Sequence, residues 1–596
     1  MNILGLSFHY HDSSAALVKD GVLVGAAAEE RFSRKKHDAG FPAQAIEFCL
    51  QAGGIARHDV DYVVFYEKPF VKFERILLTA LATFPRSAEV FRDSMQRWIT
   101  DKLWVKSLMT KHLGLPRSKI LFADHHVSHA ASSFFTSPFE EAAILTVDGV
   151  GEWTTSTLAV GRANKIQVLK EMRFPHSLGL LYSAFTAYCG FEINEGEYKL
   201  MGMHPYGKPR FADKIYELLQ VGEDGSIWQD MRYFQYQHST TDTLSTAFEE
   251  HFGRPRRDPG DADASLDPFF CDIAASIQRV TEEVLLKMAT HLKELTGLDQ
   301  LCLAGGVALN SVANFKLLRD GPFADVYIHP APGDDGCAAG AAYWAYNHVL
   351  ERPRGPALEH AYLGSEHADA AIEEFLTSNR IAFDKINDDE EFFDFVAGAL
   401  EDGNVCGWMR GRFEWGPRAL GSRSIIADPR RREMKEKLNS KIKFREAFRP
   451  FAPSVTAERA SEFFEIADHE RHWPARFMLY VAPVRESKRS VLPAVTHEDG
   501  SARMQTVYRH ANPAYHRIIE RFGERTGVPV IMNTSFNLKG EPIVESPANA
   551  FSTFSRSGMD YLFMNNFIVS ASAKKEIEDA ALATRTGDHP VTQLVS

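Results

Sequence analysis

The stretch Ala143-Ile144-Leu145-Thr146-Val147-Asp148-Gly149-Val150-Gly151-Glu152 begins as an apolar run and ends in an acidic, glycine-containing turn. A short apolar run bounded by a turn is typical of a buried strand, and the composition of residues 155–160 indicates a second strand. The segment 3–18 has the same plan, with a strand at 3–7, the polar turn His9-Tyr10-His11-Asp12-Ser13-Ser14 and a return strand at 15–18. This repetition predicts a duplicated α/β core in the first part of the chain.

Length and composition place the chain among globular proteins of more than one domain. Its 596 residues exceed what a single hydrophobic core normally supports, and its 44% hydrophobic and 24% charged residues are ordinary values. The stretch 351–365 begins rich in Pro and Gly, has no helical or strand periodicity, and predicts a linker. We therefore expect one α/β domain at 1–350 and a second at 366–596.

Charge, cysteine usage and hydropathy exclude several classes of protein. The net charge of -12 argues against a general nucleic-acid binder, so we expect no nucleic-acid partner. The six cysteines lie far apart without a Cys-x-x-Cys pair, which favours free thiols in a reducing compartment. No apolar run reaches the about 18 residues of a membrane span, and the first residues are typical of a strand. These features predict a cytoplasmic protein without a membrane partner.

Two histidines and two aspartates form a candidate metal site. His125 and His129 lie four positions apart in a run of helical composition, so their imidazoles project from one helix face. With Asp148 at its strand end they make a nitrogen and oxygen ligand set suited to Fe, Mn, Co or Zn. Asp334, in the turn 332–336, is the candidate for a fourth ligand. The alternatives are capping or surface positions for the histidines and a helix N-cap for the aspartate.

Glycine-containing segments in the first half are candidates for nucleotide binding. The turn Gly305-Gly306-Val307-Ala308-Leu309-Asn310 follows a strand and opens a helix, so its backbone N–H groups can approach a phosphate or nucleoside closely. The alternative for such a turn is a tight bend. In the segment 195–203, Lys199 is suited to neutralise a triphosphate and Gly202 to allow close backbone contact. The alternative for Lys199 is an ordinary surface lysine.

A local excess of positive charge lies in the second half of this acidic chain. Between Arg410 and Arg449 there are 13 Lys and Arg residues against five Asp and Glu. We interpret the residues at 430–437 as a solvated helix face. Five others lie among Gly, Pro, Trp and Phe, which indicates a walled pocket for a small polyanion. They are Arg418, Arg423, Lys443, Arg445 and Arg449.

The order of these motifs resembles one family, the ATP-dependent O-carbamoyltransferases of antibiotic, toxin and nodulation-factor biosynthesis. In the first half the resemblance rests on His125-x3-His129, Asp148-Gly149, Glu197-Tyr198-Lys199-Leu200-Met201-Gly202, the turn 305–310 and Gly333-Asp334. In the second half it rests on Trp415–Ser424, the segment 441–453 and Asn533-Thr534-Ser535-Phe536-Asn537-x-x-Gly540-Glu541-Pro542. The resemblance implies an actin-like (ASKHA), duplicated nucleotide-binding domain, similar to the ATPase TsaD that makes threonylcarbamoyladenosine on tRNA, followed by a YrdC-like α/β domain.

The resemblance also implies a two-step reaction. The second domain would bind carbamoyl phosphate and cleave it to carbamate, which would react at the α-phosphate of ATP, supplied with Mg²⁺ and bound in the first domain. Carbamoyl-adenylate would then pass its carbamoyl group to a hydroxyl of a small natural product and release AMP. The family's metal is iron, Fe²⁺, which the predicted ligand set permits without excluding another divalent transition metal. Beyond the five cations named above, the implied carbamoyl phosphate ligands are Arg503, Ser535 and Asn537.

The acceptor hydroxyl needs a general base, because its pKa lies far above neutrality. His11 is our candidate, since a histidine titrates near working pH and His11-Asp12 matches the family pattern. Asp12 would orient the imidazole or contact the acceptor. His9 is the alternative base. The acceptor itself and the oligomeric state are not readable from the sequence, and an oligomer stays open.

Three other functions compete with this interpretation. A tRNA-modifying threonylcarbamoyl-type transferase of the same fold is disfavoured by the acidic chain. A metallopeptidase would need a glutamate directly after the first histidine, where this chain has His126. A nucleotide sensor would bind at both sites without turnover.

Overall fold

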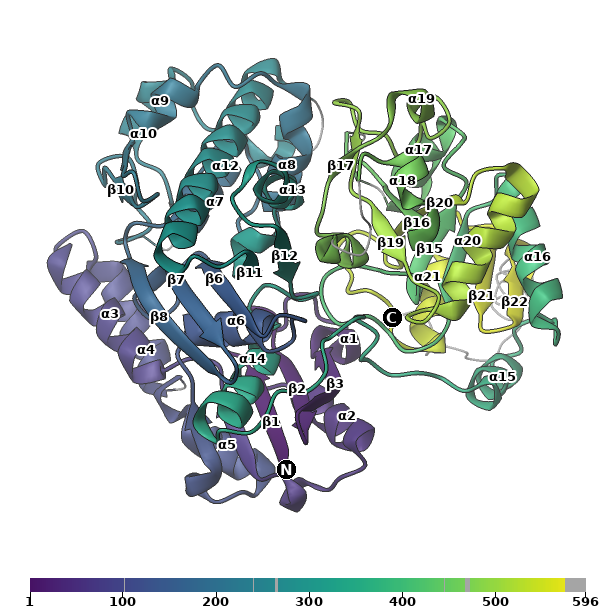
Figure 1. Ribbon diagram of the computed structural model, residues 1–596, viewed down its shortest axis with the longest axis horizontal. Helices are drawn as coiled ribbons and strands as arrows, with labels where there is room; N and C mark the ends of the chain where they lie inside the picture. The colour runs from purple at the N-terminus through teal and green to yellow at the C-terminus, as the bar shows by residue number, and fades with distance from the viewer. Residues whose placement is uncertain are drawn as a thin grey trace, which may run out of the picture.

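The computed structural model describes residues 1–100, 102–239, 241–262, 266–443, 445–446, 448–466 and 472–573. In Figure 1 the first half, in purple to teal, lies beside the second half, in green to yellow. The end of the predicted second domain, residues 574–596, lies outside the described residues. The first half contains two five-stranded sheets. One consists of β3 Val22–Ala28, β2 Ser14–Lys19, β1 Asn2–Ser7, β4 Tyr62–Phe65 and β5 Ile120–Phe122, and the other of β8 Lys165–Arg173, β7 Thr154–Arg162, β6 Glu141–Val147, β11 Gln300–Ala304 and β12 Asp325–Ile328.

The two sheets have the same topology. In each sheet, three consecutive strands form an antiparallel unit. The first strand of this unit also pairs in parallel with a later strand, and that later strand pairs in parallel with the fifth. The order β3-β2-β1-β4-β5 thus matches β8-β7-β6-β11-β12. The mixed α/β fold predicted from the sequence is confirmed, and its strand-turn repeat corresponds to this repeated sheet plan.

Two short helices pack against each other between the two sheets. They are α6 His125–Phe134, which follows the first sheet but contacts β6, β7 and β11 of the second, and α14 Cys337–Tyr343, which follows the second sheet but contacts β1 and β2 of the first. The small residues of α14 allow this close approach. A Cβ atom at Gly340 would lie only 1.9 Å from the carbonyl oxygen of Ser128 in α6. The ends of both helices are therefore held close together.

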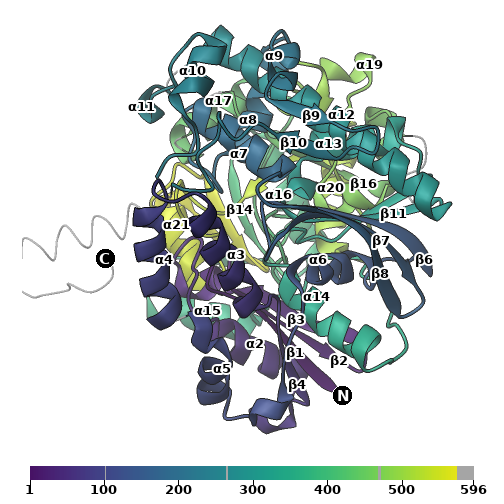
Figure 2. The same ribbon diagram turned by 90° about the vertical axis from the view of Figure 1, so that its left-hand side faces the viewer.

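Longer helices cover the outer faces of the sheets. Helix α2 Ala43–Gly53 packs on β2 and β3, and α12 Pro268–Thr296 packs on β6 and β7 together with α7 Leu178–Tyr188. Helices α3 Pro69–Ala82 and α4 Ala88–Thr100 form a hairpin at one side of the molecule (Figure 2). Within the described residues, no helix combines the length and the apolar composition that crossing a bilayer requires.

The segment 351–361 contains no helix or strand and runs along the first half, where Arg354 donates to the carbonyl oxygens of Phe134 and Ser137. Helix α15 Asp369–Ser378 opens the second half, and its N-cap is Ala368. An eight-stranded mixed sheet follows. Its order is β13 Asp384–Lys385, β22 Phe567–Ser570, β21 Tyr561–Met564, β14 Cys406–Met409, β15 Arg423–Ala427, β20 Val530–Ser535, β16 Ala452–Thr456 and β19 Gln505–Val507.

Both faces of this sheet are covered. Helices α16 Asp389–Glu401 and α20 Pro513–Thr526 pack together on one face, over a core that includes Trp408 and Tyr515. Helices α17 Glu433–Leu438 and α21 Pro547–Ser555 belong to the core of the other face. The resemblance of this half to a YrdC-like domain stays a prediction.

Hydrogen bonds from side chains of the first half to backbone carbonyl groups of the second half hold the two halves together. Buried Arg31 donates to the carbonyl oxygen of Gly416, and Arg34 donates to those of Pro542 and Ile543. Gly416 has a φ of 105°, and a Cβ atom there would lie 2.4 Å from the carbonyl oxygen of Pro330. Loops of the second half therefore lie directly against the edge of the second sheet.

Candidate functional site

His125 and His129 of α6 lie buried, with 1% and 0% of their surfaces exposed, which excludes the surface alternative. Helix α6 begins at His125, so His125 and His129 occupy one face one turn apart. Their Nε2 atoms are 3.1 Å apart. Buried Glu152 fixes the start of the helix, because its carboxylate accepts the backbone N–H of His125 at 3.1 Å.

Both predicted aspartates face these imidazoles. Asp148 Oδ2 lies 3.2 Å from His125 Nε2 and 3.9 Å from His129 Nε2. Asp334 Oδ1 lies 3.6 Å and 3.4 Å from the same two atoms. The N-cap alternative for Asp334 is not supported, because helix α14 is capped at Gly336 without a side-chain hydrogen bond. The structure thus brings all four residues of the predicted metal site together.

This geometry suits a shared cation. Ligand atoms that each lie about 2.1 Å from one metal ion are roughly 3.0 Å apart at right angles and roughly 3.4 Å apart in a tetrahedron. Five distances are given above between ligand atoms of the two histidines and the two aspartates. Four of these five lie between 3.1 and 3.6 Å. Burial opposes protonation of His125, yet the carboxylates of Asp334 and Asp148 raise its pKa to about 9. The buried carboxylates therefore favour positive charge at this position, whether a proton or a metal ion supplies it.

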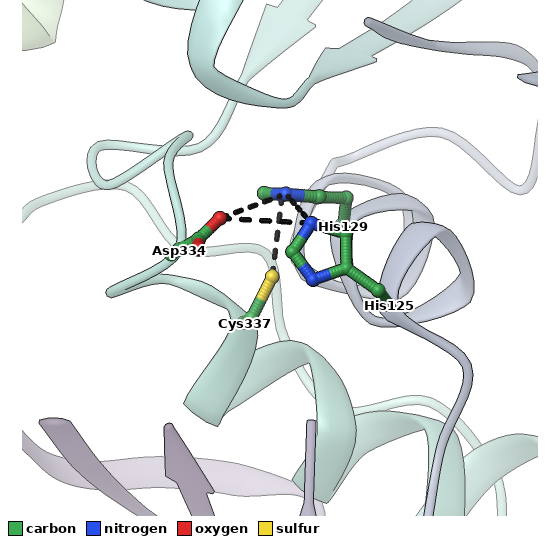
Figure 3. A group of neighbouring side chains, drawn as sticks. All are labelled: His125, His129, Asp334 and Cys337. Atoms are coloured by element: carbon green, nitrogen blue, oxygen red, sulfur yellow. Dashed lines mark hydrogen bonds and ion pairs between the residues drawn. The ribbon is translucent and has the colours of Figure 1, made fainter. Parts of the chain in front are cut away.

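A cysteine that the sequence analysis missed completes the surroundings of the histidines. Figure 3 shows His125, His129, Asp334 and Cys337 pointing toward one another from α6, the loop before α14 and the start of α14. Cys337 Sγ lies 3.3 Å from His129 Nδ1, on the ring side opposite Nε2. Burial raises the pKa of this thiol well above its usual range, so the sulfur stays protonated in the absence of a metal. A contact at Nδ1 leaves Nε2 free to bind a metal, as outer hydrogen bonds do in many metal sites.

The turn that was predicted to bind nucleotide packs within the fold and orients Asp148. Gly305 has a φ of 95°, and a Cβ atom there would lie 2.2 Å from the carbonyl oxygen of Val147. Gly306 N–H donates to Asp148 Oδ1 at 2.8 Å, which orients Asp148 toward the histidines. The side chain of Asn310 caps α13 Ser311–Asp320 and exchanges hydrogen bonds with Gln278. The turn therefore sits beside the candidate metal site, but the Asn310 amide is engaged within the fold.

The turn between β1 and β2 holds the candidate base. His11 Nδ1 lies 2.7 Å from Asp12 Oδ2. Burial lowers the pKa of His11, but this hydrogen bond and the charge of Asp334 raise it to about 9. His9, the alternative base, has a φ of 78° and packs its ring against Phe8. The contact with Asp12 therefore favours His11 over His9.

A second cluster consists of partly buried arginines of the second half. Burial lowers the pKa of Arg503 well below its usual range, and the nearby guanidinium groups of Arg418, Arg445 and Arg449 lower it further. Burial likewise lowers the pKa of Arg418 to about 10. Among the described residues, the buried Nε atoms of Arg418 and Arg503 have no hydrogen-bond partner. Unpaired N–H groups on mutually repelling cations favour a bound anion.

Lys443 joins this cluster to the two polar residues predicted beside it. Its buried ammonium donates to Asn537 Oδ1 at 2.8 Å and to Ser535 Oγ at 3.2 Å. Burial, Arg445 and Arg449 together lower the pKa of Lys443 well below its usual range. Arg423 is different, because its guanidinium donates to the carbonyl oxygens of Gly411, Ser422, Ser365 and Glu545. Its position supports a role within the fold and does not support the predicted role as an anion ligand.

Lys199, predicted to bind nucleotide, instead faces the arginine cluster. It lies in α8 Glu197–Met203, and its Nζ is 2.7 Å from Glu446 Oε1. Glu446 Oε2 in turn lies 3.3 Å from Arg449 Nη1, and the Arg449 guanidinium lies 4.6 Å from the ring centre of Tyr198. A Cβ atom at Gly202 would contact Pro450 at 3.9 Å. Helix α8 therefore belongs to the boundary with the second half, and neither predicted nucleotide contact is supported by position.

Two family models together match most of the chain. The model described as carbamoyltransferase N-terminus matches residues 2–343, and the model described as carbamoyltransferase C-terminus matches residues 397–571. The first contains the candidate metal site and the candidate base, and the second contains the arginine cluster.

Similar proteins span both halves. An uncharacterised protein of Synechocystis is 48% identical, over 97% of this chain and 98% of its own length. Nodulation protein NolNO of Sinorhizobium fredii is 39% identical over 94% of this chain and 79% of its own length. The 3'-hydroxymethylcephem-O-carbamoyltransferase of Amycolatopsis lactamdurans is 33% identical over 57% of this chain and 61% of its own length.

Proposed function

The chain belongs to the carbamoyltransferase family, and from this premise we propose that it moves the carbamoyl group of carbamoyl phosphate to a hydroxyl of a small molecule, with ATP as activator. The observation that carries the proposal is the arginine cluster around Arg503, with its buried and unpartnered Nε atoms. A carbamoyltransferase needs a site for a small phosphate ester, and this cluster has the charge and the unpaired donors for one.

In the second half, we assign Arg418, Arg445, Arg449 and Arg503 to the phosphate of carbamoyl phosphate. Their N–H groups would donate hydrogen bonds to its phosphate oxygens in place of the water lost on burial. Lys443, Ser535 and Asn537 form one hydrogen-bonded group beside them, which suits the amide and carbonyl ends of the carbamoyl group. Breakdown there would yield carbamate, and the actin-like first half would hold the ATP that activates it as carbamoyl-adenylate.

In the first half, His125, His129, Asp148 and Asp334 fit a divalent transition metal such as Fe²⁺ by donor type and spacing. When bound, such an ion supplies Lewis-acid stabilisation of negative charge on phosphate oxygens. The turn at Gly305 and Gly306 lies beside this site, where the Gly306 N–H orients Asp148. ATP with Mg²⁺ is the nucleotide that we propose here.

For the transfer step, His11 would take the proton of the acceptor hydroxyl. Asp12 accepts a hydrogen bond from Nδ1, so Nε2 of the neutral imidazole is the ring nitrogen left to act as base. Because the pKa of His11 is raised to about 9, the neutral form and the transfer rate should increase as pH rises toward 9. The acceptor oxygen would bond to the carbamoyl carbon while the bond from that carbon to the phosphate oxygen breaks, and AMP would leave with the electron pair. General-base help of this kind contributes about 10²–10⁴-fold.

The proposal is tested by incubating the protein with carbamoyl phosphate, ATP and hydroxylated metabolites. We expect pyrophosphate release that depends on carbamoyl phosphate, together with a carbamoyl mass gain on an acceptor by mass spectrometry. Arg503→Met should abolish both, whereas Arg432→Met, on an exposed position of the same basic region, should change neither. Carbamoyl phosphate without any effect on pyrophosphate release would overturn the proposal.

The same experiment separates the rival functions. Threonylcarbamoyl transfer to tRNA would require tRNA retention in a filter-binding assay, a metallopeptidase would cleave protein without ATP, and a nucleotide sensor would bind ATP without releasing pyrophosphate. Carbamoyl-phosphate-dependent turnover with a small hydroxylated acceptor excludes all three.

A further inference from the structure

The carboxylate of Asp12 lies between two imidazoles from different loops. Its Oδ2 is 2.7 Å from His11 Nδ1, and its Oδ1 is 2.7 Å from His37 Nδ1. The side chains of all three residues are between about one quarter and one third exposed, at 27%, 29% and 29%, so water competes only partly for these contacts. Each oxygen of Asp12 thus faces its own histidine.

His37 is itself held from a second direction. Its Nε2 lies 3.1 Å from Glu195 Oε1, and the other oxygen of Glu195 lies 3.0 Å from Lys36 Nζ. Its backbone N–H donates to Glu30 Oε2 at 3.0 Å. Glu195 comes from the second repeat of the first half, whereas Asp12 and His37 come from the first, so this chain of contacts crosses between the repeats.

Backbone conformation adds an independent observation. Asp12 has a φ of 55° and His37 a φ of 51°, and left-handed backbone is uncommon for residues other than glycine. Such conformations persist where the surrounding structure enforces them, and they concentrate at functional sites. Here both ends of one hydrogen bond adopt this conformation.

We infer that His37 is a positioning residue for carbamoyl transfer, because it fixes the Asp12 carboxylate so that Asp12 holds the His11 imidazole toward the acceptor. The inference rests on the proposed function and adds to it a residue that touches neither substrate nor metal ligand. Because both ring nitrogens of His37 face carboxylates, both donate, and His37 carries a proton that stays in place. The proton of the acceptor hydroxyl still goes to His11 Nε2.

Other charged groups surround the two histidines. Within the described residues, those that face His37 are Asp12, Glu30, Lys36 and Glu195, and those that face His11 are Asp12, Asp148 and Asp334. The hydrogen bond that His37 donates to Asp12 raises the pKa of His37, which agrees with a proton on both nitrogens. His37 therefore neutralises part of the charge of Asp12 without taking over its contact with His11.

Two amide variants separate the contacts of His37. In His37→Asn the amide nitrogen occupies a position similar to Nδ1, so the hydrogen bond to Asp12 is kept. In His37→Gln the amide lies near the position of Nε2, so the contact with Glu195 is kept and that with Asp12 is lost. His58→Gln, on a histidine whose side chain is 85% exposed, is the matched control.

The assay uses carbamoyl phosphate, ATP and molar methanol as a minimal hydroxyl acceptor, with AMP and methyl carbamate as products. We expect His37→Gln to lower kcat for AMP release and methyl carbamate formation roughly 10- to 100-fold. The affinities for ATP and carbamoyl phosphate and the pyrophosphate burst of the first turnover should stay at wild-type values. Steady-state pyrophosphate release should fall together with AMP release, because each AMP comes from one carbamoyl-adenylate. His37→Asn and His58→Gln should retain wild-type transfer within about 3-fold.

The outcomes distinguish this inference from the function on which it rests. If the wild-type protein releases neither pyrophosphate nor AMP, the proposed function fails. If His11→Ala transfers normally, the base assignment fails and the inference with it. If His11→Ala is inactive in transfer while His37→Gln equals the wild type, or while His37→Asn is as impaired as His37→Gln, the role of His37 alone is refuted.

Discussion

Replacing Arg418 by methionine should stabilise the ligand-free protein while weakening its use of carbamoyl phosphate. Burial lowers the pKa of Arg418 to about 10, and its Nε has no partner among the described residues. The difference from the ordinary value of 12.5 corresponds to about 3 kcal/mol against the buried cation at neutral pH. Methionine keeps a long flexible side chain and removes the charge, so we expect a gain of about 1–3 kcal/mol in the free energy of unfolding.

The same substitution removes donors that we assign to the phosphate. Each hydrogen bond to a charged group contributes about 1.5–3 kcal/mol, which corresponds to roughly 10- to 100-fold weaker carbamoyl phosphate binding. Thermal unfolding with and without carbamoyl phosphate measures both effects in one experiment. At 100-fold excess over Kd the ligand should stabilise the wild-type protein by about 2.7 kcal/mol, and it should stabilise Arg418→Met far less.

Arg432→Met provides the control, because Arg432 is exposed in the same basic region and should alter neither the melting temperature nor the response to ligand. The reasoning is refuted if Arg418→Met melts below the wild type without ligand and still responds fully to carbamoyl phosphate. Arg418 would then be a structural cation rather than one kept unpaired for an anion.

Three further predictions concern the first half. Asp148→Asn keeps an acceptor for Gly306 but removes a charged ligand atom. The metal content after dialysis, measured by plasma mass spectrometry, should therefore fall roughly tenfold or more. A metal content equal to that of the wild type would refute the assignment of Asp148 as a ligand. Burial lowers the pKa of His329 to about 4, so this imidazole is neutral in the folded protein but protonates near pH 6.5 in the unfolded chain. Its contribution to the free energy of unfolding is therefore lost as pH falls from 6.5 toward 4, by about 1.4 kcal/mol per pH unit. The urea midpoint of His329→Gln should depend less on pH in that window than the midpoint of the wild type. An equal slope in both proteins would contradict this. Gly340→Ala would place a methyl group 1.9 Å from the Ser128 carbonyl oxygen and should cost about 2 kcal/mol or more in chemical unfolding, whereas an unchanged midpoint would mean that α6 and α14 separate freely.

The sequence predicted those parts of the site that depend on local geometry. A spacing of four residues on a helix places His125 and His129 on one face whatever surrounds them. Asp148 ends a strand, and the carboxyl ends of parallel neighbouring strands lie at one edge of a sheet, so the turns after β6, β11 and β12 meet there. The meeting of Asp148 with Asp334 follows from these two rules once the strand order is known.

Contacts between distant segments were beyond such rules. Lys199 stands in a glycine-containing motif that is suited to a phosphate, yet its partner Glu446 lies in the other half of the chain. Arg423 has the same sequence surroundings as Arg418, but strand β15 turns its guanidinium toward backbone carbonyls. Cys337 and His37 carry no local signal, because a lone cysteine and a lone histidine are compatible with many surroundings. Their roles become visible only through the atoms that they contact.

One short segment contacts both candidate sites, which bears on how the two halves cooperate. Glu195 holds His37 beside the candidate base, and Tyr198 and Lys199 hold Arg449 and Glu446 beside the arginine cluster. Glu195 precedes α8 and Tyr198 lies in its first turn, so a shift of Arg449 toward a bound anion would act on Tyr198 only three residues from Glu195. In the reaction that we propose, carbamate released in one half would be useful only when the other half is ready to activate it and transfer its carbamoyl group. A segment anchored at both places gives the fold a direct physical connection between these two events.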